Sequence, residues 1–193
     1  MNTDQLLKYS TLFLLISWSV LWKIKSREAD RVKPRLKKDS LPQYLSSMFF
    51  WTGSLIIIFQ LLGLQIFPRP YDLRFQIAGL ILILIGMSVS IAGRIVLDTN
   101  WTNAHQYQIK KNHQLVTGGI YKYIRHPIYT GIIFTGTGAE LVASSNLFLP
   151  AFLLTLGWSY LQARKEEKLL TSFFKNKYTQ YMSKTKRFIP YLF

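Results

Sequence analysis

The sequence predicts an all-α, polytopic membrane protein with about five transmembrane helices, the last two forming a hairpin, and a C-terminal cytoplasmic interfacial helix. Two observations support this fold class. Charged residues are nearly absent from five apolar blocks and are concentrated in the short segments between them. Two of the blocks, 44–67 and 73–97, exceed the roughly 20 residues that a helix needs to cross a hydrocarbon core of about 30 Å.

The first apolar block, residues 6–22, carries a single charge, Lys8, near its start. Positive charges follow this block instead of preceding it, and no small-residue cleavage pattern comes after it. We therefore expect a retained span and not a signal peptide. The next segment, 23–43, contains eight Lys and Arg residues, and we interpret it as a basic cytoplasmic loop that faces the lipid headgroups.

The last two blocks, 128–143 and 147–163, are separated by the sequence SSN. Each block has only 16 or 17 residues, which corresponds to roughly 25 Å of helix, so each crosses the membrane marginally. SSN is typical of a turn, because short polar side chains hydrogen-bond to the nearby backbone. The pattern predicts a helical hairpin over 128–163.

Basic residues alternate between rich and poor connecting segments. Segments 23–43 and 164–193 carry eight each and 98–127 carries four, whereas 68–74 carries two. Because basic loops stay in the cytoplasm, we expect the N-terminus outside and the C-terminus inside. The polar stretch before residue 128 and the C-terminal tail would then share the cytoplasmic face.

The composition argues against several functions. A net charge of +15 is compatible with nucleic-acid binding, but basic residues beside apolar spans are typical of cytoplasmic membrane loops, so we expect no nucleic-acid partner. The chain has no cysteine, which excludes disulfides, thiolate zinc sites and a cysteine nucleophile. Its three histidines show no metal-ligand spacing, and we expect no metal site.

The sequence RHP opens the fourth apolar block. Proline suits the first turn of a helix, so Pro127 marks a helix start and pushes His126 toward an extended conformation. The unsatisfied N–H groups of that turn would face the cytoplasm, where they favour a carboxylate or phosphate, with Arg125 and His126 as further donors. The alternative is that Arg125 anchors the interface beside an aromatic belt of tyrosines.

Small and acidic residues continue along the same helix. Gly131, Gly136 and Gly138 would allow close approach of another helix or of a ligand. Glu140 lies near the outer turn, and although carboxylates inside membranes are functional candidates, we expect it at headgroup level.

The second polar cluster follows the fifth block. If that helix continues past the membrane, its apolar and aromatic residues share one face: Leu170, Phe174, Tyr178 and Tyr181. Arg164 and Glu167 are three residues apart and could pair. Of the adjacent Glu166 and Glu167, at least one could face a cationic or hydroxyl-bearing ligand. The alternative is a surface helix with ion pairs along the membrane plane.

These segments together resemble a known family. NW at 100–101, HQLVTGGIYKYIRHPIYTG at 113–131, KEEKLL at 165–170 with the aromatic residues after it, and RFIP at 187–190 resemble the isoprenylcysteine carboxyl methyltransferases. That family belongs to a membrane methyltransferase superfamily that includes phospholipid methyltransferases. The resemblance covers about half of the chain and points to a compact prokaryotic type. It divides the chain into a three-span region, 1–97, and a methyltransferase core, 98–193.

The resemblance implies S-adenosyl-L-methionine as methyl donor, with S-adenosyl-L-homocysteine as product, in a cytoplasmic pocket. The implied cofactor residues are His113, Leu115, Val116, Gly119, Tyr121, His126, Pro127, Tyr129, Gly131, Glu166 and Glu167. The implied catalytic residues are Arg125, Arg164 and Glu167. One position departs from the family pattern: Gln162 stands where an arginine is common, four residues before the first glutamate of the pair, and Arg164 lies two residues later, on a different helical face.

The resemblance favours methylation of the carboxylate of an isoprenylcysteine-like lipidic substrate that enters from the bilayer. Three alternatives remain: an amine-directed phospholipid methyltransferase, a non-catalytic membrane protein that binds a lipid or a partner, and a related reductase branch. Membrane lipids are the expected surroundings, and we expect a prokaryotic cell membrane. A carboxylate arrives ionised and needs a cation such as Arg164 or Arg125 to orient it, whereas an amine needs a base such as His126, Glu166 or Glu167.

Overall fold

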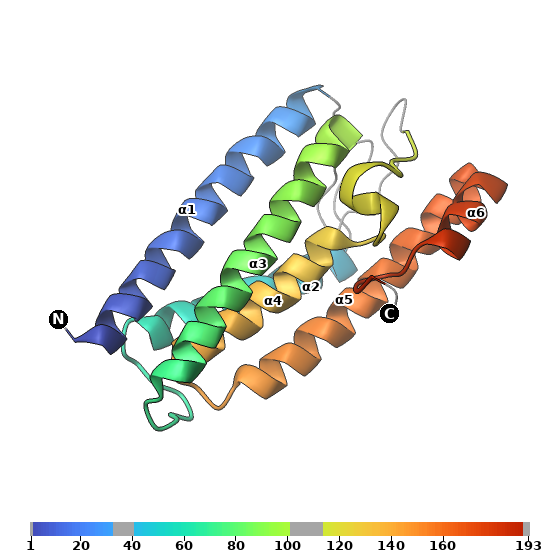
Figure 1. The fold of residues 1–193 in the computed structure, drawn as a ribbon. Coiled ribbons are helices and arrows are strands. Elements are labelled where there is room, and N and C mark those ends of the chain that lie inside the picture. Colours follow the sequence, from blue (N-terminus) through green and yellow to red (C-terminus); the bar gives the residue numbers. More distant parts are fainter. Residues whose placement is uncertain (1, 33–40, 101–113, 191–193) are drawn as a thin grey trace.

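The computed structural model describes residues 2–32, 41–100 and 114–190, and the regular elements of this part of the chain are all helices, without a β-strand. Its long helices lie side by side along one direction (Figure 1). The elements are α1 (Thr3–Val32), α2 (Leu41–Leu61), α3 (Leu73–Leu97), η1 (Asp98–Asn100), η2 (Gly119–Lys122), α4 (Pro127–Val142), α5 (Phe148–Phe174) and α6 (Asn176–Lys184).

The observed helices follow the apolar blocks, with differences at their ends. Helix α3 has the bounds of the block 73–97, and its N-cap Asp72 accepts a hydrogen bond from the backbone N–H of Arg74 at 2.9 Å. Helix α1 continues to Val32, so the first half of the predicted basic loop 23–43 is helical. Helix α5 also continues beyond the apolar block 147–163. The charged residues from Arg164 onward therefore lie on the same helix, past its apolar part.

Helices α3 and α4 form the most extensive contact in the bundle, and glycines face each other across it. A Cβ atom on Gly131 would lie 1.8 Å from the hydroxyl of Ser90 and 2.4 Å from the backbone oxygen of Gly86. One on Gly138 would lie 2.4 Å from the backbone oxygen of Gly79. The two helices therefore touch backbone to backbone, as small residues permit in membrane helix pairs.

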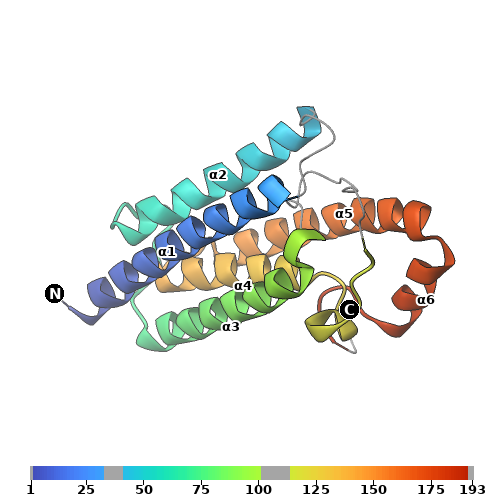
Figure 2. The same ribbon diagram turned by 90° about the horizontal axis from the view of Figure 1, so that it is seen from above.

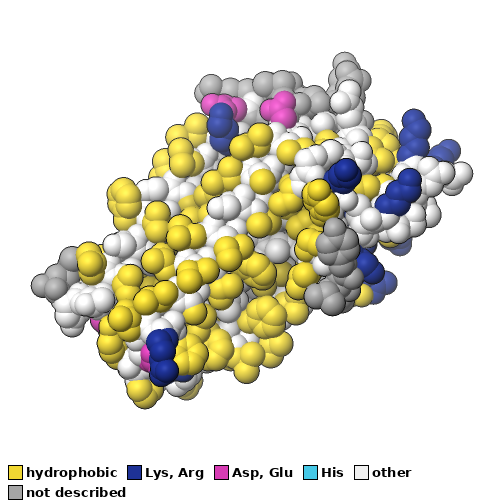
Figure 3. Space-filling model, in the orientation of Figure 1, with side chains coloured by type: hydrophobic (Ala, Val, Ile, Leu, Met, Phe, Trp, Pro, Cys, Tyr) yellow, Lys and Arg dark blue, Asp and Glu magenta, His cyan; other side chains and the backbone are white. Residues whose placement is uncertain are grey.

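Two helices in the described part of the chain are long and apolar enough to cross a membrane, at Tyr44–Leu61 and Leu73–Leu97. Figure 3 shows apolar side chains over the middle of the molecule and Lys and Arg side chains toward its ends. Helix α4 has 16 residues, so it is short for a full crossing. The structure gives an all-helical bundle, and the number of five spans stays a prediction.

The turn between α4 and α5 is held by the segment that precedes α3. Ser144 has a positive φ of 57°, and its backbone oxygen accepts a hydrogen bond from the N–H of Arg69 at 2.8 Å. The N–H of Asn146 donates to the oxygen of Phe67 at 3.0 Å. The predicted SSN turn is therefore a docked connection of a helical hairpin.

The position expected for Glu140 is wrong. Its exposed fraction is 3%, and both carboxylate oxygens accept hydrogen bonds from the side-chain amide of Gln60 on α2, at 3.1 and 3.0 Å. Helix α2 packs against α4, so this carboxylate lies inside the bundle and not among headgroups. A hydrogen-bonded partner is what burial of a carboxylate requires.

The C-terminal region turns back toward the start of α4 (Figure 2). The continuous helix expected through residue 181 breaks at Lys175, which has φ 51° and ψ −128°. The apolar face is nevertheless kept, because Leu170 and Phe174 pack with Tyr178 and Tyr181 of α6. This fold brings α5, α6 and the start of α4 to one end of the bundle.

Candidate active site

The polar cluster at this end begins with the RHP sequence. Pro127 occupies the first turn of α4 and His126 is the N-cap residue. Just before the helix, the chain runs beside the C-terminal tail: the N–H of Arg125 donates to the oxygen of Lys186 at 2.8 Å, and that of His126 donates to Arg187 at 3.0 Å. The tail is thereby fixed against the start of α4.

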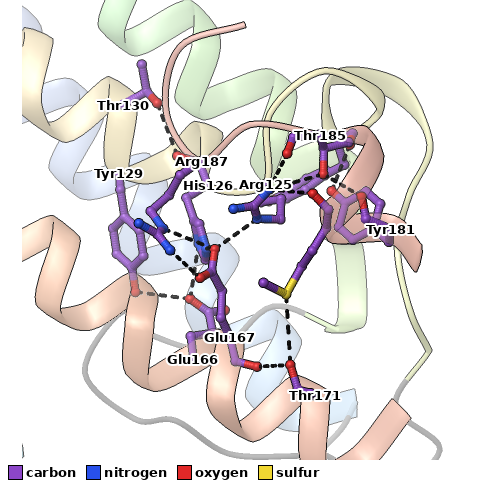
Figure 4. A network of polar contacts seen from close by, with 12 residues as sticks. Arg125, His126, Tyr129, Thr130, Glu166, Glu167, Thr171, Tyr181, Thr185 and Arg187 are labelled. Carbon is purple, nitrogen blue, oxygen red and sulfur yellow. Dashed lines mark hydrogen bonds and ion pairs between the residues drawn. The ribbon is translucent and has the colours of Figure 1, made fainter. Parts of the chain in front are cut away.

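Glu167 of α5 is the centre of the cluster (Figure 4). Its carboxylate accepts hydrogen bonds from Arg125 Nε at 2.9 Å and from Arg187 Nε and Nη2 at 3.1 and 2.7 Å. His126 Nε2 lies 3.2 Å from the same carboxylate. The two-point contact with Arg187 has the geometry of a strong charge-assisted pair. One buried carboxylate thus holds two arginines and a histidine, from two segments far apart in the sequence.

Arg125 is held on its other side as well. Its guanidinium donates to the backbone oxygens of Met182 and Thr185, and so connects the end of α6 to Glu167. Only 9% of its side chain is exposed. The structure therefore shows Arg125 with its hydrogen-bonding capacity largely used within the protein.

Glu166 differs from its neighbour in exposure and in partners. Its side chain is 36% exposed, against 6% for Glu167. Its carboxylate accepts a hydrogen bond from the Tyr129 hydroxyl at 3.2 Å and lies 3.5 Å from His126 Nδ1. The imidazole of His126 therefore bridges both glutamates, and it stacks on the Tyr129 ring with centroids 5.3 Å apart.

The electrostatics favour a charged cluster. Burial disfavours the imidazolium, but hydrogen bonds with Glu166 and Glu167 outweigh burial and raise the pKa of His126 above its ordinary value of 6.5. Burial likewise favours the neutral form of Glu167, yet hydrogen bonds from His126, Arg187 and Arg125 hold its pKa well below the ordinary value of 4.5. Glu167 therefore stays ionised through the physiological range, beside a histidine that titrates above its usual pH.

Arg164 does not pair with Glu167, although the spacing allowed it. Its side chain is exposed, and its guanidinium carbon lies 5.9 Å from the centre of the Tyr160 ring. Arg187 approaches the same ring to 4.9 Å. Glu167 takes its partners from the start of α4 and from the tail because its side chain points into the bundle, whereas that of Arg164 points outward.

The other predicted cofactor residues lie around the cluster. Leu115 and Val116 pack on the tyrosines Tyr121, Tyr178 and Tyr181, and the hydroxyl of Tyr181 donates to the backbone oxygen of Tyr121 at 2.7 Å. These contacts support the segment that leads into RHP. His113 lies outside the described residues.

Two predicted glycines have packing contacts. Gly119 has a positive φ of 57°, and a Cβ atom there would lie 2.7 Å from a methyl group of Val96. Gly131 faces Gly86 and Ser90 of α3, on the side of α4 away from the glutamates. The structure therefore does not bring the Cα atom of Gly131 into the polar cluster.

Sequence reasoning missed Arg187. It belongs to the RFIP sequence at 187–190, which was part of the family resemblance but carried no assigned role. Its importance depends on the pairing of the tail with residues 125–126, which adjoin it only in the fold. Thr130 offers a similar contact, since its hydroxyl donates to the backbone oxygen of Phe188 at 2.8 Å.

Comparisons with known proteins identify the group to which this arrangement belongs. The sequence model of the family "Phospholipid methyltransferase" matches residues 75–177. The chain is 25% identical over 151 residues to a "Probable protein-S-isoprenylcysteine O-methyltransferase" of Oryza sativa subsp. indica, covering 77% of this chain and 78% of the relative. It is 31% identical over 117 residues to a "Protein-S-isoprenylcysteine O-methyltransferase" of Tribolium castaneum, covering 56% of this chain and 41% of the relative.

A solved structure has the same fold. The eukaryotic intramembrane Ras methyltransferase ICMT (isoprenylcysteine carboxyl methyltransferase) superposes with a TM-score of 0.63 at 20% sequence identity, over 96% of this chain and 68% of that one. The family match extends from α3 into α6 and so includes RHP and the Glu166–Glu167 pair, whereas Arg187 of the tail lies outside it. The chain therefore belongs to the phospholipid methyltransferase family, as a membrane methyltransferase related to the isoprenylcysteine O-methyltransferases.

Proposed function

We propose that the protein transfers a methyl group from S-adenosyl-L-methionine to the carboxylate of an isoprenylcysteine-like lipidic substrate. The observation that carries this proposal is a half-exposed carboxylate, Glu166, set beside the N-terminus of α4 at the charged end of an otherwise apolar bundle. The isoprenylcysteine O-methyltransferase relatives support the choice of acceptor.

The residues at this end fit the proposed donor. Helix α4 begins at Pro127 next to the cluster, and the unsatisfied N–H groups of its first turn, with the positive end of the helix dipole, suit a carboxylate. Glu166 suits an ammonium group or ribose hydroxyls, and Tyr129 and His126 orient its carboxylate. When bound, the donor supplies a methyl group already activated by its sulfonium.

The two glutamates have different tasks in this proposal. Glu167 is saturated by Arg125, His126 and Arg187, so it acts as a positioning residue that fixes the walls of the site. Glu166 keeps accessible oxygen and faces the donor. From the sequence, both glutamates were expected to bind the cofactor and Glu167 also to be catalytic; in this proposal the contact with the donor belongs to Glu166.

The acceptor needs a cation and an apolar path. Arg164 is exposed, and its guanidinium lies near the Tyr160 ring. We therefore assign to Arg164, and not to Arg125, the orientation of the substrate carboxylate. A lipid tail reaches the site from the bilayer, where the water-free surroundings keep the ionised carboxylate reactive.

A second candidate is N-methylation of a phospholipid amine. The family description favours it, and so does the contact of His126 with Glu166. An amine must lose a proton before it attacks, and a histidine bridging two carboxylates offers a route for that proton.

The orientation of the chain in the membrane is part of the same proposal. The Glu166–Glu167 end faces the cytoplasm, which supplies the soluble donor, and the start of α1 lies outside a prokaryotic cell membrane. The excess of Lys and Arg in 164–193 over 68–74 supports this orientation. The division into a membrane region, 1–97, and a methyltransferase core, 98–193, is part of the same proposal.

The test is transfer of radiolabelled methyl groups by the purified protein in lipid nanodiscs. An N-acetyl farnesylcysteine and phosphatidylethanolamine are offered in parallel, and products are treated with base. A methyl ester releases volatile label and an N-methyl group does not, so the two candidates are separated chemically. Arg164→Met should lower ester formation, with Arg164→Lys as the matched control. Absence of label on either acceptor, together with absence of donor binding, would refute the methyltransferase reaction for these substrates.

A further inference from the structure

A second polar site lies at the opposite end of the bundle from Glu167, near the N-terminus in Figure 1. A cavity of about 250 Å³ is lined there by α1 and by the end of α2 and the residues after it. Its lining residues include Asp4, Lys8, Tyr9, Leu61, Leu62 and Gln65. This volume is below the roughly 300–1,000 Å³ of sites for drug-sized ligands, so it suits a small polar group.

Lys8 is the unusual member of this lining. Its exposed fraction is 6%, and its ammonium lies 2.9 Å from one oxygen of Asp4. The other oxygen of Asp4 accepts a hydrogen bond from the amide of Gln76 at 2.6 Å. An ammonium has three N–H donors, and within the described residues Asp4 is its one hydrogen-bond partner. Lys8 therefore has donor capacity left inside an apolar bundle.

Polar atoms deeper in the same region also lack partners. The hydroxyl of Thr11, one turn beyond Lys8 on α1, and the amide oxygen of Gln60, next to Leu61, are buried without a hydrogen bond in the described part of the chain. A buried polar atom that stays unpaired costs free energy. Neither residue lines the cavity, so the unused donor capacity of Lys8 is the feature that points to a ligand from outside the chain.

The charges of the lining select the kind of ligand. Asp4 and Lys8 are its charged members and cancel each other. A net anionic group would face Asp4 as well as Lys8, whereas a group with one positive and one negative charge complements both. Leu61 and Leu62 provide apolar wall for the adjoining lipid.

We propose that this cavity binds the headgroup of a zwitterionic phospholipid, with the phosphate on Lys8 Nζ and the ammonium on Asp4. The site is separate from the proposed methyl-transfer site and does not depend on it. Its occupant would tie α1 to α2, which share few other contacts at this end.

The experiment is native mass spectrometry of delipidated protein to which phosphatidylethanolamine, phosphatidylglycerol or inorganic phosphate is added. We expect wild-type protein to bind phosphatidylethanolamine about tenfold more tightly than phosphatidylglycerol, because only the former has an ammonium for Asp4, and we expect Lys8→Met to bind both lipids about tenfold more weakly, because both present a phosphate. Lys25→Met is the matched control, because Lys25 is also paired on α1, with Glu28 at 2.9 Å, but is exposed.

Three results would overturn the proposal. They are unchanged binding by Lys8→Met, equal binding of the two lipids by wild-type protein, and displacement of the lipid by inorganic phosphate, which would indicate a site for free anions. If Lys8→Met does not fold, Leu62→Trp tests the same point by filling the cavity from its exposed wall without touching the ion pair. Retention of phosphatidylethanolamine by a folded Leu62→Trp protein would equally refute the site.

Discussion

Replacing Glu167 with glutamine should unfold the site, whereas the same change at Glu166 should weaken donor binding only. Glu167→Gln leaves Arg125, Arg187 and a charged His126 without their common anion. Breaking a buried ion pair by removing one partner costs about 3–5 kcal/mol. Since the amide keeps one acceptor oxygen, we expect the lower end of that range, or roughly a hundredfold in the folding equilibrium.

Glu166→Gln removes a charge that is 36% exposed, so its effect on the free energy of unfolding should stay below about 1 kcal/mol. A charge-assisted hydrogen bond contributes about 1.5–3 kcal/mol, so we expect S-adenosylmethionine to bind this variant at least about tenfold more weakly. The free energy of unfolding is measured by titration with SDS in mixed micelles, and donor affinity by calorimetry. Equal destabilisation by both variants, or a larger loss of stability for Glu166→Gln, would refute the division of roles.

Three further predictions concern other parts of the site. Arg187→Met should lower the free energy of unfolding by about 1–2 kcal/mol, because it removes two hydrogen bonds to a buried carboxylate, whereas Arg164→Met should be neutral in the same SDS titration; equal effects would contradict the assignment. Gly131→Ala should destabilise the α3–α4 pair, since its Cβ has no space, and Gly136→Ala, which meets no atom within 4 Å, should not; melting temperatures in detergent compare the two, and a harmless Gly131→Ala would be contrary to the packing described. The raised pKa of His126 stabilises the fold fully below about pH 6.5, and this contribution is lost as the pH rises through the folded-state pKa. The melting temperature of wild-type protein should therefore fall as the pH rises above about 6.5, and a His126→Gln variant that shows the same fall would exclude this histidine as its cause.

The helices were the predictable part of the structure, because their causes are local. The block 73–97 matches α3, and Pro127 begins α4 as its fixed backbone angle requires. The break at Lys175 was not predictable from apolar spacing, since residues on both sides of it still contribute to one packed face.

The site was predictable only in its sequence-local half. RHP and the glutamate pair stand out because charged residues adjoin apolar spans. Arg187 does not, since it reaches Glu167 through a tail that pairs with the start of α4. Burial of Glu140 had the same cause: its amide partner, Gln60, comes from a helix 80 residues away in sequence. Side chains that meet through tertiary packing leave no periodic signal along the chain.

The glycine contacts between α3 and α4 also bear on how a lipid gains entry. Helices whose backbones touch cannot slide or rotate against each other without a clash, so the pair moves as one rigid body. The start of α4 is therefore a fixed reference point for the donor. If the substrate is the proposed prenyl lipid, an opening for its chain would have to come from elsewhere, such as between α2 and α5, which meet through larger side chains including Trp158 and Phe50, with ring centroids 4.3 Å apart. The part of the bundle that holds the donor and the part that would admit the lipid would then be different helices.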